Sequence, residues 1–308
     1  MSARPILVIK HGALGDIILA TAAFAAIRAN HPDARMIALT SKPYAELLAQ
    51  TPYFDDVWVD PKPRLGQFKT TLTLARMLRS QPWQWVYDLQ TSTRSTWYQW
   101  LLARPWPNIS NVSRWSNHGY TDPARHKKHA FENLRLQLAI AGIAPIAQPD
   151  VSWLTGQAHD WGISAPYALL VPGGSAHRPE KRWPAEHYAT LAAALAERGI
   201  TPVLIGSDAE RATLEFISAK VKQVVNLGGA TSFGQLADLA RGAQCAIGND
   251  TGPMHIIAAT GCPATVLFSH ASNPDYSAPI GPAVTILRER DLRDLSVDQV
   301  HAGLTERR

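Results

Sequence analysis

The chain has 308 residues, 46% hydrophobic and 18% charged, with 30 Lys and Arg against 25 Asp and Glu. This composition excludes a disordered chain and a coiled coil, and at about 100–200 residues per domain the length predicts two domains. Two cysteines, Cys245 and Cys262, are too few for a disulfide framework, and the longest apolar run, residues 17–27, is too short to cross a bilayer, so we expect a cytoplasmic protein.

In the first half of the chain, short β-branched runs alternate with amphipathic segments. We predict strands over residues 6–9, 36–39, 57–59 and 85–88, and helices over 16–30 and 129–142. Six prolines interrupt this pattern within the stretch 61–135, and we expect loops and short helices there, on one edge of the first domain.

The stretch 61–135 also carries most of the positive charge. It holds 12 Lys and Arg against Asp88, Asp122 and Glu132, together with six of the ten tryptophans. Basic residues mixed with tryptophan favour an anionic partner that offers a ring or chain for stacking: a phosphorylated glycan, a lipid headgroup or a nucleic acid. A solvated basic surface with tryptophans in the core fits the same pattern, and both interpretations stay open.

The alternation restarts after a segment at 145–166 that contains proline and glycine. We predict strands over 167–171, 202–205, 223–226, 245–248 and 264–268, and helices over 184–198, 208–220, 233–241 and 253–260. We also expect a short helix from Ser296 that packs back across the pair of domains. Two such blocks predict an α/β protein with two doubly wound parallel sheets, in domains 1–155 and 156–308. Because ligands lie at the carboxyl ends of such strands, we expect the site in a cleft between the domains.

Three loops carry the candidate functional residues. The first, Lys10-His11-Gly12-Ala13-Leu14-Gly15-Asp16, follows the first strand and matches neither the P-loop nor the dinucleotide-binding fingerprint. Asp16 at the start of a helix is typical of an N-cap, and a carboxylate there could also take a proton from a hydroxyl. On spacing alone the capping role is favoured.

The second and third loops follow strands of the second half. Pro172-Gly173-Gly174-Ser175 offers backbone N–H groups to an anion, and Lys181 and Arg182 could neutralise phosphate, although two solvated cations on a surface loop explain this segment equally well. In Asn249-Asp250-Thr251-Gly252-Pro253-Met254-His255 a helix opens at Pro253, and its unpaired N–H groups suit a pyrophosphate. The alternative is that Asp250 and Thr251 only cap the helix while His255 packs in the core. The density of polar groups favours binding.

Two sequence features bear on metal chemistry. The sequence contains no Asp-x-Asp tripeptide and no His, Cys or carboxylate cluster with metal-ligand spacing. We therefore expect no metal and no cofactor, with phosphates held by Lys, Arg and helix N-termini.

Taken in order, the three segments resemble the heptosyltransferase family (glycosyltransferase family 9), which builds the inner core of lipopolysaccharide. Gly12-Ala13-Leu14-Gly15-Asp16-Ile17 resembles the opening loop of the family, Lys181-Arg182-Trp183-Pro184 its Lys-x-Trp-Pro element, and Asp250-Thr251-Gly252-Pro253-Met254-His255 its Asp-Thr/Ser-Gly-x-x-His signature. The resemblance implies the GT-B fold, two Rossmann-like domains facing a central cleft. It also implies an acceptor bound by the first domain, a nucleotide sugar bound by the second, and metal-independent transfer with inversion at the anomeric carbon.

The resemblance further implies roles for single residues. Asp16 would be the general base on the acceptor hydroxyl, with Gly15 beside it on the acceptor side. The donor-binding residues would be Lys181, Asp250, Thr251, Gly252 and His255 at the diphosphate and sugar, Gly174, Ser175 and Glu210 at phosphate and ribose, and Thr231 and Ser232 at the adenine. We add Arg76, Arg79 and Arg94 as basic contacts of the acceptor.

The expected function is inverting transfer of a heptose, or a related sugar, from ADP-heptose to a lipopolysaccharide core or lipid-linked glycan. We expect peripheral contact with the inner face of the cytoplasmic membrane and no nucleic acid as partner. A GT-B-like sugar-nucleotide epimerase and a non-catalytic binder of nucleotide sugars or anionic glycans are the alternatives. The charge of 61–135 argues against the epimerase, and Asp16 and Lys181 argue against the binder.

Overall fold

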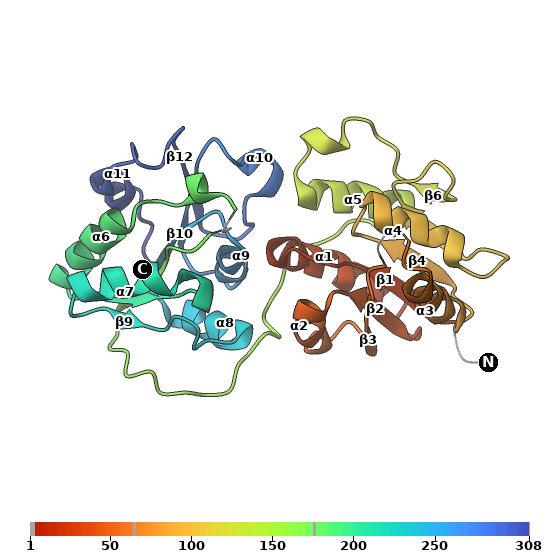
Figure 1. The fold of residues 1–308 in the computed structure, drawn as a ribbon, viewed down its shortest axis with the longest axis horizontal. Helices are drawn as coiled ribbons and strands as arrows, with labels where there is room; N and C mark the ends of the chain where they lie inside the picture. Colours follow the sequence, from red (N-terminus) through yellow and green to blue (C-terminus); the bar gives the residue numbers. More distant parts are fainter. Residues whose placement is uncertain (1–3, 64–65, 175–176, 308) are drawn as a thin grey trace. The chain divides into compact units, whose positions relative to one another are not determined.

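The structure is a computed structural model that describes residues 4–63, 66–174 and 177–307. The chain divides into two compact units, residues 1–148 and 149–308, and each is built on a six-stranded parallel sheet (Figure 1). The boundary lies a few residues before the expected one at residue 155.

The first unit has the strand order β3-β2-β1-β4-β5-β6. Its strands are β1 (Ile6–Ile9), β2 (Met36–Thr40), β3 (Asp56–Val59), β4 (Trp85–Asp88), β5 (Asn108–Asn111) and β6 (His118–Gly119). Its helices are α1 (Leu14–Asn30), α2 (Ala45–Ala49), α3 (Phe68–Arg79), α4 (Thr93–Trp97) and α5 (Ala130–Ile140), with 3₁₀ turns η1 (Lys42–Tyr44), η2 (Tyr98–Leu101) and η3 (Arg125–Lys127).

The second unit has the order β12-β11-β10-β7-β8-β9. Its strands are β7 (Tyr167–Val171), β8 (Thr201–Leu204), β9 (Val225–Asn226), β10 (Cys245–Asn249), β11 (Ala264–Phe268) and β12 (Val284–Arg288). Its helices are α6 (Ala185–Glu197), α7 (Arg211–Lys220), α8 (Phe233–Gly242), α9 (Gly252–Ala259), α10 (Pro274–Ser277) and α11 (Val297–Ala302), with 3₁₀ turns η4 (Pro179–Lys181) and η5 (Asp208–Glu210).

Both sheets therefore have the doubly wound order in which the first strand lies at the centre, which confirms the predicted fold class. Helices cover both faces of each sheet (Figure 1). The central strands β1, β2 and β11 are buried along their whole length, as expected of parallel strands that are covered on both sides.

Each unit has its own apolar core. In the first, Leu74 and Leu78 of α3 pack with Leu7 and Ile9 of β1. In the second, Val300 of α11 joins the core formed with α6 and α7, so the C-terminal helix packs back within its own unit. Among the described residues no helix is both long and apolar enough to cross a membrane.

The structure corrects the expectation of loops and short helices over 61–135. That stretch includes the 12-residue helix α3, and β5 and β6 extend the sheet on one edge. The sequence pattern misses β5 because its buried side chains include polar ones, Ser110 and Asn111. The amide of Gln137 donates to Ser110 and that of Asn111 to Gln99, so the burial of these polar groups is compensated.

Candidate functional site

The strand order reverses beside the first strand of each sheet, between β1 and β4 and between β7 and β10. In open α/β sheets, ligands bind beyond the carboxyl ends of the strands at such a switch point. The three loops chosen from the sequence follow β1, β7 and β10. Each of them therefore lies at one of the two switch points.

Asp16 lies in the first turn of α1 and faces a cavity. The helix begins at Leu14 with Ala13 as its N-cap, so Asp16 is the third helical residue and the prediction that it is the N-cap is wrong. Its carboxylate accepts a hydrogen bond from the Ala13 N–H at 3.2 Å, and this donor lies within the turn built around Gly12. Gly15 is buried inside the same turn.

The cavity beside Asp16 has a volume of about 170 Å³ and a largely polar wall, which includes Lys10, Gln90, Thr91, Tyr120, Arg125, Asn133 and Gln137. Lys10 is buried, and its ammonium donates to the Leu89 carbonyl at 3.2 Å. Burial lowers the pKa of Lys10, and the charges of Asp16 and Asp88 oppose that shift. An ammonium therefore lies within electrostatic reach of the Asp16 carboxylate.

Asp88 ends β4 on the other side of the switch point. Its buried carboxylate accepts from the backbone N–H groups of Gln90 and Thr91 at 3.0 and 3.2 Å. Burial raises the pKa of Asp88 to about 6, although hydrogen bonds and the nearby His11 act in the opposite direction. Asp88 is not among the residues predicted from the sequence, although a carboxylate at the end of an apolar strand was a signal that could have indicated it.

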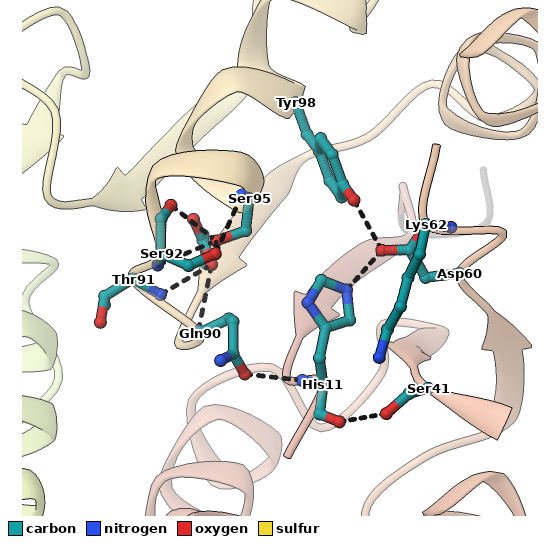
Figure 2. Close-up of polar contacts among 10 residues, drawn as sticks. His11, Ser41, Asp60, Lys62, Gln90, Thr91, Ser92, Ser95 and Tyr98 are labelled. Carbon is teal, nitrogen blue, oxygen red and sulfur yellow. Dashed lines mark hydrogen bonds and ion pairs between the residues drawn. The ribbon is translucent and has the colours of Figure 1, made fainter. Parts of the chain in front are cut away.

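A second cavity, of about 430 Å³, borders the same opening loop. Its wall is formed by His11, Gly12, Ala13, Ser41, Pro43, Tyr44, Lys62, Gln90, Ser92 and Arg94. Lys62 and Arg94 are both exposed, and neither forms an ion pair within the described part of the chain. Two cations without a carboxylate partner at one cavity favour an anionic ligand. Figure 2 shows several of these side chains around His11.

The other two predicted acceptor contacts lie elsewhere in the first unit. Arg76 and Arg79 occupy the last turns of α3 and line neither cavity, and the guanidinium of Arg79 donates to the Leu101 carbonyl at 2.8 Å. Both are exposed. Arg94 therefore lines the cavity beside the loop after β1, whereas Arg76 and Arg79 lie on α3 and line neither of the two cavities.

Of the tryptophans in 61–135, some lie in the core and others are exposed, where they could stack on a partner. Trp83 is buried, and its indole donates to the Leu78 carbonyl, so it belongs to the core. Trp97, Trp100 and Trp115 are 64%, 41% and 60% exposed, which is unusual for so large an apolar side chain. A stacking or interfacial role therefore rests on the exposed three.

In the second unit, an ion pair joins the second and third loops. The Lys181 ammonium lies 2.6 Å from the Asp250 carboxylate, and the two side chains are only 14% and 9% exposed. Lys181 ends η4, and Asp250 directly follows β10. Two residues 69 positions apart thus meet at the switch point between β7 and β10.

Asn249 holds these loops in place and was missed from the sequence. Its fully buried amide donates to the carbonyls of Pro172 and Gly173 at 2.8 and 3.1 Å. Its oxygen accepts from the Trp183 N–H and the Tyr188 hydroxyl at 3.0 and 3.1 Å. One amide therefore ties the loop after β7 and the start of α6 to the end of β10.

Among the residues that the structure describes, no side chain caps the start of α9. Thr251 is its N-cap but makes no capping hydrogen bond, and Asp250 pairs with Lys181, so the alternative in which these two residues only cap the helix is wrong. Gly252 opens the helix, and His255 is buried in its first turn. A helix start without side-chain caps leaves backbone N–H groups for a ligand.

The remaining predicted donor residues border the loop after β7 or open α8. The Glu210 side chain lies against the loop after β7, because a Cβ atom added to Gly173 would be 3.1 Å from the Glu210 carboxyl carbon. The Glu210 carboxylate also accepts a hydrogen bond from the Ser207 N–H at 2.9 Å. Gly174 is buried and its carbonyl accepts from Arg182. Ser232, after Thr231, is the N-cap of α8. Ser175 lies outside the described residues.

The described residues offer neither a metal-binding cluster nor a reactive thiol. Within residues 4–63, 66–174 and 177–307, no three His, Cys, Asp or Glu side chains come close enough together to hold a metal ion. Cys245 and Cys262 are buried free thiols, and burial raises the pKa of each to about 12, so neither is a reactive thiolate.

Two Rossmann-like units with loops of this kind at both switch points define a GT-B-like α/β protein. Residues 71–299 match glycosyltransferase family 9 (heptosyltransferase), and the chain belongs to this family. The family suggested by the three sequence segments is thereby confirmed. The matched range includes the Lys181 and Asp250 loops and begins after the Asp16 loop.

Individual relatives extend the comparison. Lipooligosaccharide heptosyltransferase 2 of Haemophilus ducreyi is 34% identical over 121 residues, 37% of this chain and 35% of that protein, so the match spans about a third of this relative. Lipopolysaccharide heptosyltransferase 2 of Salmonella typhimurium is 24% identical over 92% of this chain and 87% of its own length. The solved structure of E. coli ADP-heptose lipopolysaccharide heptosyltransferase II superposes with a TM-score of 0.79 at 22% identity, covering 97% of each chain, and shows the same fold.

Proposed function

We propose that the protein is an inverting, metal-independent glycosyltransferase that moves a heptose from ADP-heptose to a lipopolysaccharide core. The names of the relatives supply both substrate classes, since they are heptosyltransferases of lipopolysaccharide or lipooligosaccharide and one is named for ADP-heptose. The observation that carries the proposal is the Lys181–Asp250 pair, because it fixes a cation in the crevice where a doubly wound sheet binds phosphates.

The second unit would bind the donor. Lys181 and the uncapped start of α9 offer positive charge and N–H groups to the diphosphate, and Asp250 orients the ammonium of Lys181. As the bond between the anomeric carbon and the phosphate oxygen breaks, charge builds on the departing ADP, and these groups stabilise it. Gly174, Ser175, Glu210, Thr231, Ser232 and His255 complete the proposed donor site.

The first unit would bind the acceptor. Asp16 faces the polar 170 Å³ cavity with Lys10 and Arg125, so a sugar hydroxyl in that cavity can hydrogen-bond to its carboxylate. Asp16 takes the hydroxyl proton while the oxygen attacks the anomeric carbon from the face opposite the diphosphate. A single displacement of this kind inverts the anomeric configuration.

The acceptor would be an anionic glycolipid at the inner face of the cytoplasmic membrane. Lys62 and Arg94 border the second cavity and have no ion-pair partner among the described residues. Arg76 and Arg79 are exposed on α3, and Trp97 and Trp100 are exposed and close to Arg94 in the sequence. Cations near an anionic membrane each contribute about 1 kcal/mol and are screened by salt. Indole rings favour the membrane interface.

Charge reversal tests the membrane contact. The variant Arg76→Glu/Arg79→Glu/Arg94→Glu should lose binding to vesicles that contain anionic lipid and should raise the KM for a membrane-borne acceptor, with donor affinity unchanged. Arg288→Glu, at an exposed position of the second unit, is the matched control. A triple variant that binds such vesicles as well as the wild-type protein does at low salt would remove this surface from the proposal.

The reaction itself is tested with ADP-heptose and deacylated lipopolysaccharide cores that carry no, one or two heptoses. We expect ADP release, a mass gain of one heptose on one of the cores, and the same rate with a chelator. Loss of activity with the chelator and its return with magnesium would overturn the metal-independent mechanism. Conversion of the nucleotide sugar without transfer would favour the epimerase, and donor binding without any turnover would favour the non-catalytic binder.

A further inference from the structure

His11 is held by residues that follow three neighbouring strands. Its backbone N–H donates to the Gln90 side-chain oxygen at 2.8 Å, and its carbonyl accepts from the Ser41 hydroxyl (Figure 2). Its ring Nε2 lies 2.6 Å from the Asp60 carboxylate. These partners come from the ends of β4, β2 and β3, so the ring is fixed at the point where the loops of the first sheet meet.

Asp60 determines which ring nitrogen of His11 carries a proton. Its carboxylate is completely buried and accepts from the Tyr98 hydroxyl and from the Lys62 N–H, each at 2.7 Å. Burial alone would raise the pKa of Asp60, but hydrogen bonds from His11, Tyr98 and Lys62 hold it below its usual value. An ionised carboxylate only accepts hydrogen bonds, so the proton between the two residues lies on Nε2 of His11.

The second ring nitrogen, Nδ1, points away from Asp60, and His11 is one of the residues that line the 430 Å³ cavity. Figure 2 shows it on the side of the ring opposite Asp60, towards Gln90 and Ser92. His11, Gln90 and Ser92 all line the 430 Å³ cavity, and no hydrogen bond to Nδ1 is formed by the residues described. In the tautomer with its proton on Nε2, Nδ1 is a hydrogen-bond acceptor that is oriented in advance.

We propose that His11 binds the acceptor substrate, with Nδ1 accepting a hydrogen bond from a saccharide hydroxyl in this cavity, and that Asp60 and Tyr98 position the ring. The inference rests on the proposed function and adds to it a residue that selects the acceptor. The ligand class is a polyhydroxylated sugar that carries a carboxylate or phosphate, because Lys62 and Arg94 border the same cavity. Asp16, five residues further on, remains the proton acceptor.

The main test separates acceptor binding from catalysis. In His11→Gln, the amide N–H can still donate to Asp60, but the amide oxygen is one bond further from Cβ than Nδ1, so no acceptor remains at the Nδ1 position. We expect the KM for the deacylated core oligosaccharide to rise about tenfold, the effect of one lost hydrogen bond, while kcat and the KM for ADP-heptose stay within about threefold. Asp60→Asn should raise the same KM, because the ring loses the carboxylate that orients it. His118→Gln, on the edge strand β6, is the matched control and should behave as the wild-type protein.

Direct binding distinguishes this inference from the proposed function. Calorimetry with the core oligosaccharide should give a wild-type Kd for Asp16→Asn, in which transfer is expected to be slow, and a weaker Kd for His11→Gln. An active enzyme whose His11→Gln variant keeps the wild-type acceptor Kd and loses kcat would show that His11 only supports the loop, which overturns the inference alone. Wild-type protein that neither binds nor glycosylates any core would overturn the proposed function and this inference with it.

A measurement on the wild-type protein covers the case in which His11→Gln does not fold. The ¹⁵N resonance of His11 Nδ1 should shift when the core oligosaccharide is added and should not shift with ADP alone, because a new hydrogen bond changes the shielding of that nitrogen. An unchanged resonance at saturating oligosaccharide would overturn the inference.

Discussion

The two units share one sheet topology but differ in the kind of side chain that lies at the switch point. In the first unit the side chains around the loop after β1 are buried and ionisable: Lys10, His11, Asp60 and Asp88. In the second, the buried side chains are the amide of Asn249 and the imidazole of His255, and the charged pair Lys181–Asp250 is nearer the surface. The crevice at a switch point can therefore be held together by buried charged groups that pair with one another, or by a neutral amide whose hydrogen bonds are all formed.

This difference predicts which property each site depends on. A buried charge is stable only while its partners are present and correctly protonated, whereas a buried amide only has to keep its hydrogen bonds. The balance of charge follows the same division, with 17 Lys and Arg against 9 Asp and Glu in residues 1–148, and 13 against 16 in residues 149–308. We expect substitutions in the first unit to act through charge and those in the second through geometry and phosphate contact.

The largest effect is expected at Asp16. Asp16→Asn removes the proposed base, and transfer should slow by about 10²–10⁴-fold. The amide oxygen of the new side chain can still accept from the Ala13 N–H, so the fold and the affinity for ADP should persist. Single-turnover kinetics, together with thermal stabilisation by ADP, checks both parts. Wild-type turnover in this variant would leave Asp16 only its role at the helix start.

In the second unit the largest effect is expected at Asn249. Asn249→Ala leaves two buried carbonyls, the Trp183 N–H and the Tyr188 hydroxyl without this partner, and the free energy of unfolding should fall by about 3–5 kcal/mol. Urea denaturation measures the loss. Asn273→Ala, which removes the side-chain cap of the short helix α10, is the control and should cost about 1 kcal/mol. Equal losses would mean that water replaces the amide.

Lys181 should affect binding more than stability. Lys181→Ala removes the cation from the donor crevice, and the Kd for ADP should rise about 10–100-fold, a loss of about 1.4–3 kcal/mol. Calorimetry with ADP measures it, and Lys222→Ala, at an exposed position of the same unit, is the control. An unchanged Kd with reduced stability would make the Lys181–Asp250 pair a purely structural ion pair.

The burial of a strand decides how well the sequence could predict it. Residues 6–9, 85–88, 167–171 and 264–268 form strands with the predicted ends, because strands covered on both faces are continuous apolar runs. The short β6 and the only partly buried edge strand β12 have no such signal. The polar β5 has none either.

The candidate site likewise has a part that the sequence could predict and a part that it could not. The loops after β1, β7 and β10 could be predicted because, in each, glycine and polar residues come directly after an apolar strand. The partners within them could not, because His11 and Asp60 are 49 residues apart and only the register of β1, β2 and β3 brings them together. The bonds of Asn249 likewise depend on the pairing of β10 with β7.

The smallest expected effect tests the buried charge of the first unit directly. Burial raises the pKa of Asp88 to about 6 from a usual value of 3.8, so between about pH 4 and 6 the folded state holds a proton that the unfolded state has released. The free energy of unfolding should therefore fall as pH rises through this window, and at pH 7 the ionised Asp88 destabilises the fold. Asp88→Asn keeps an oxygen that accepts from Gln90 and Thr91 and removes the charge.

We expect Asp88→Asn to be more stable than the wild-type protein by about 1–2 kcal/mol at pH 7 and equally stable near pH 4. This gain is smaller than the roughly 3 kcal/mol that the whole pKa shift represents, because Lys10 loses one of its two nearby anions. Urea denaturation at the two pH values measures it, with the exposed Asp33→Asn as control. A variant that is less stable at pH 7 would mean that Lys10 and His11 more than offset the burial of an ionised Asp88. The charges at this switch point would then stabilise the first unit as Asn249 stabilises the second.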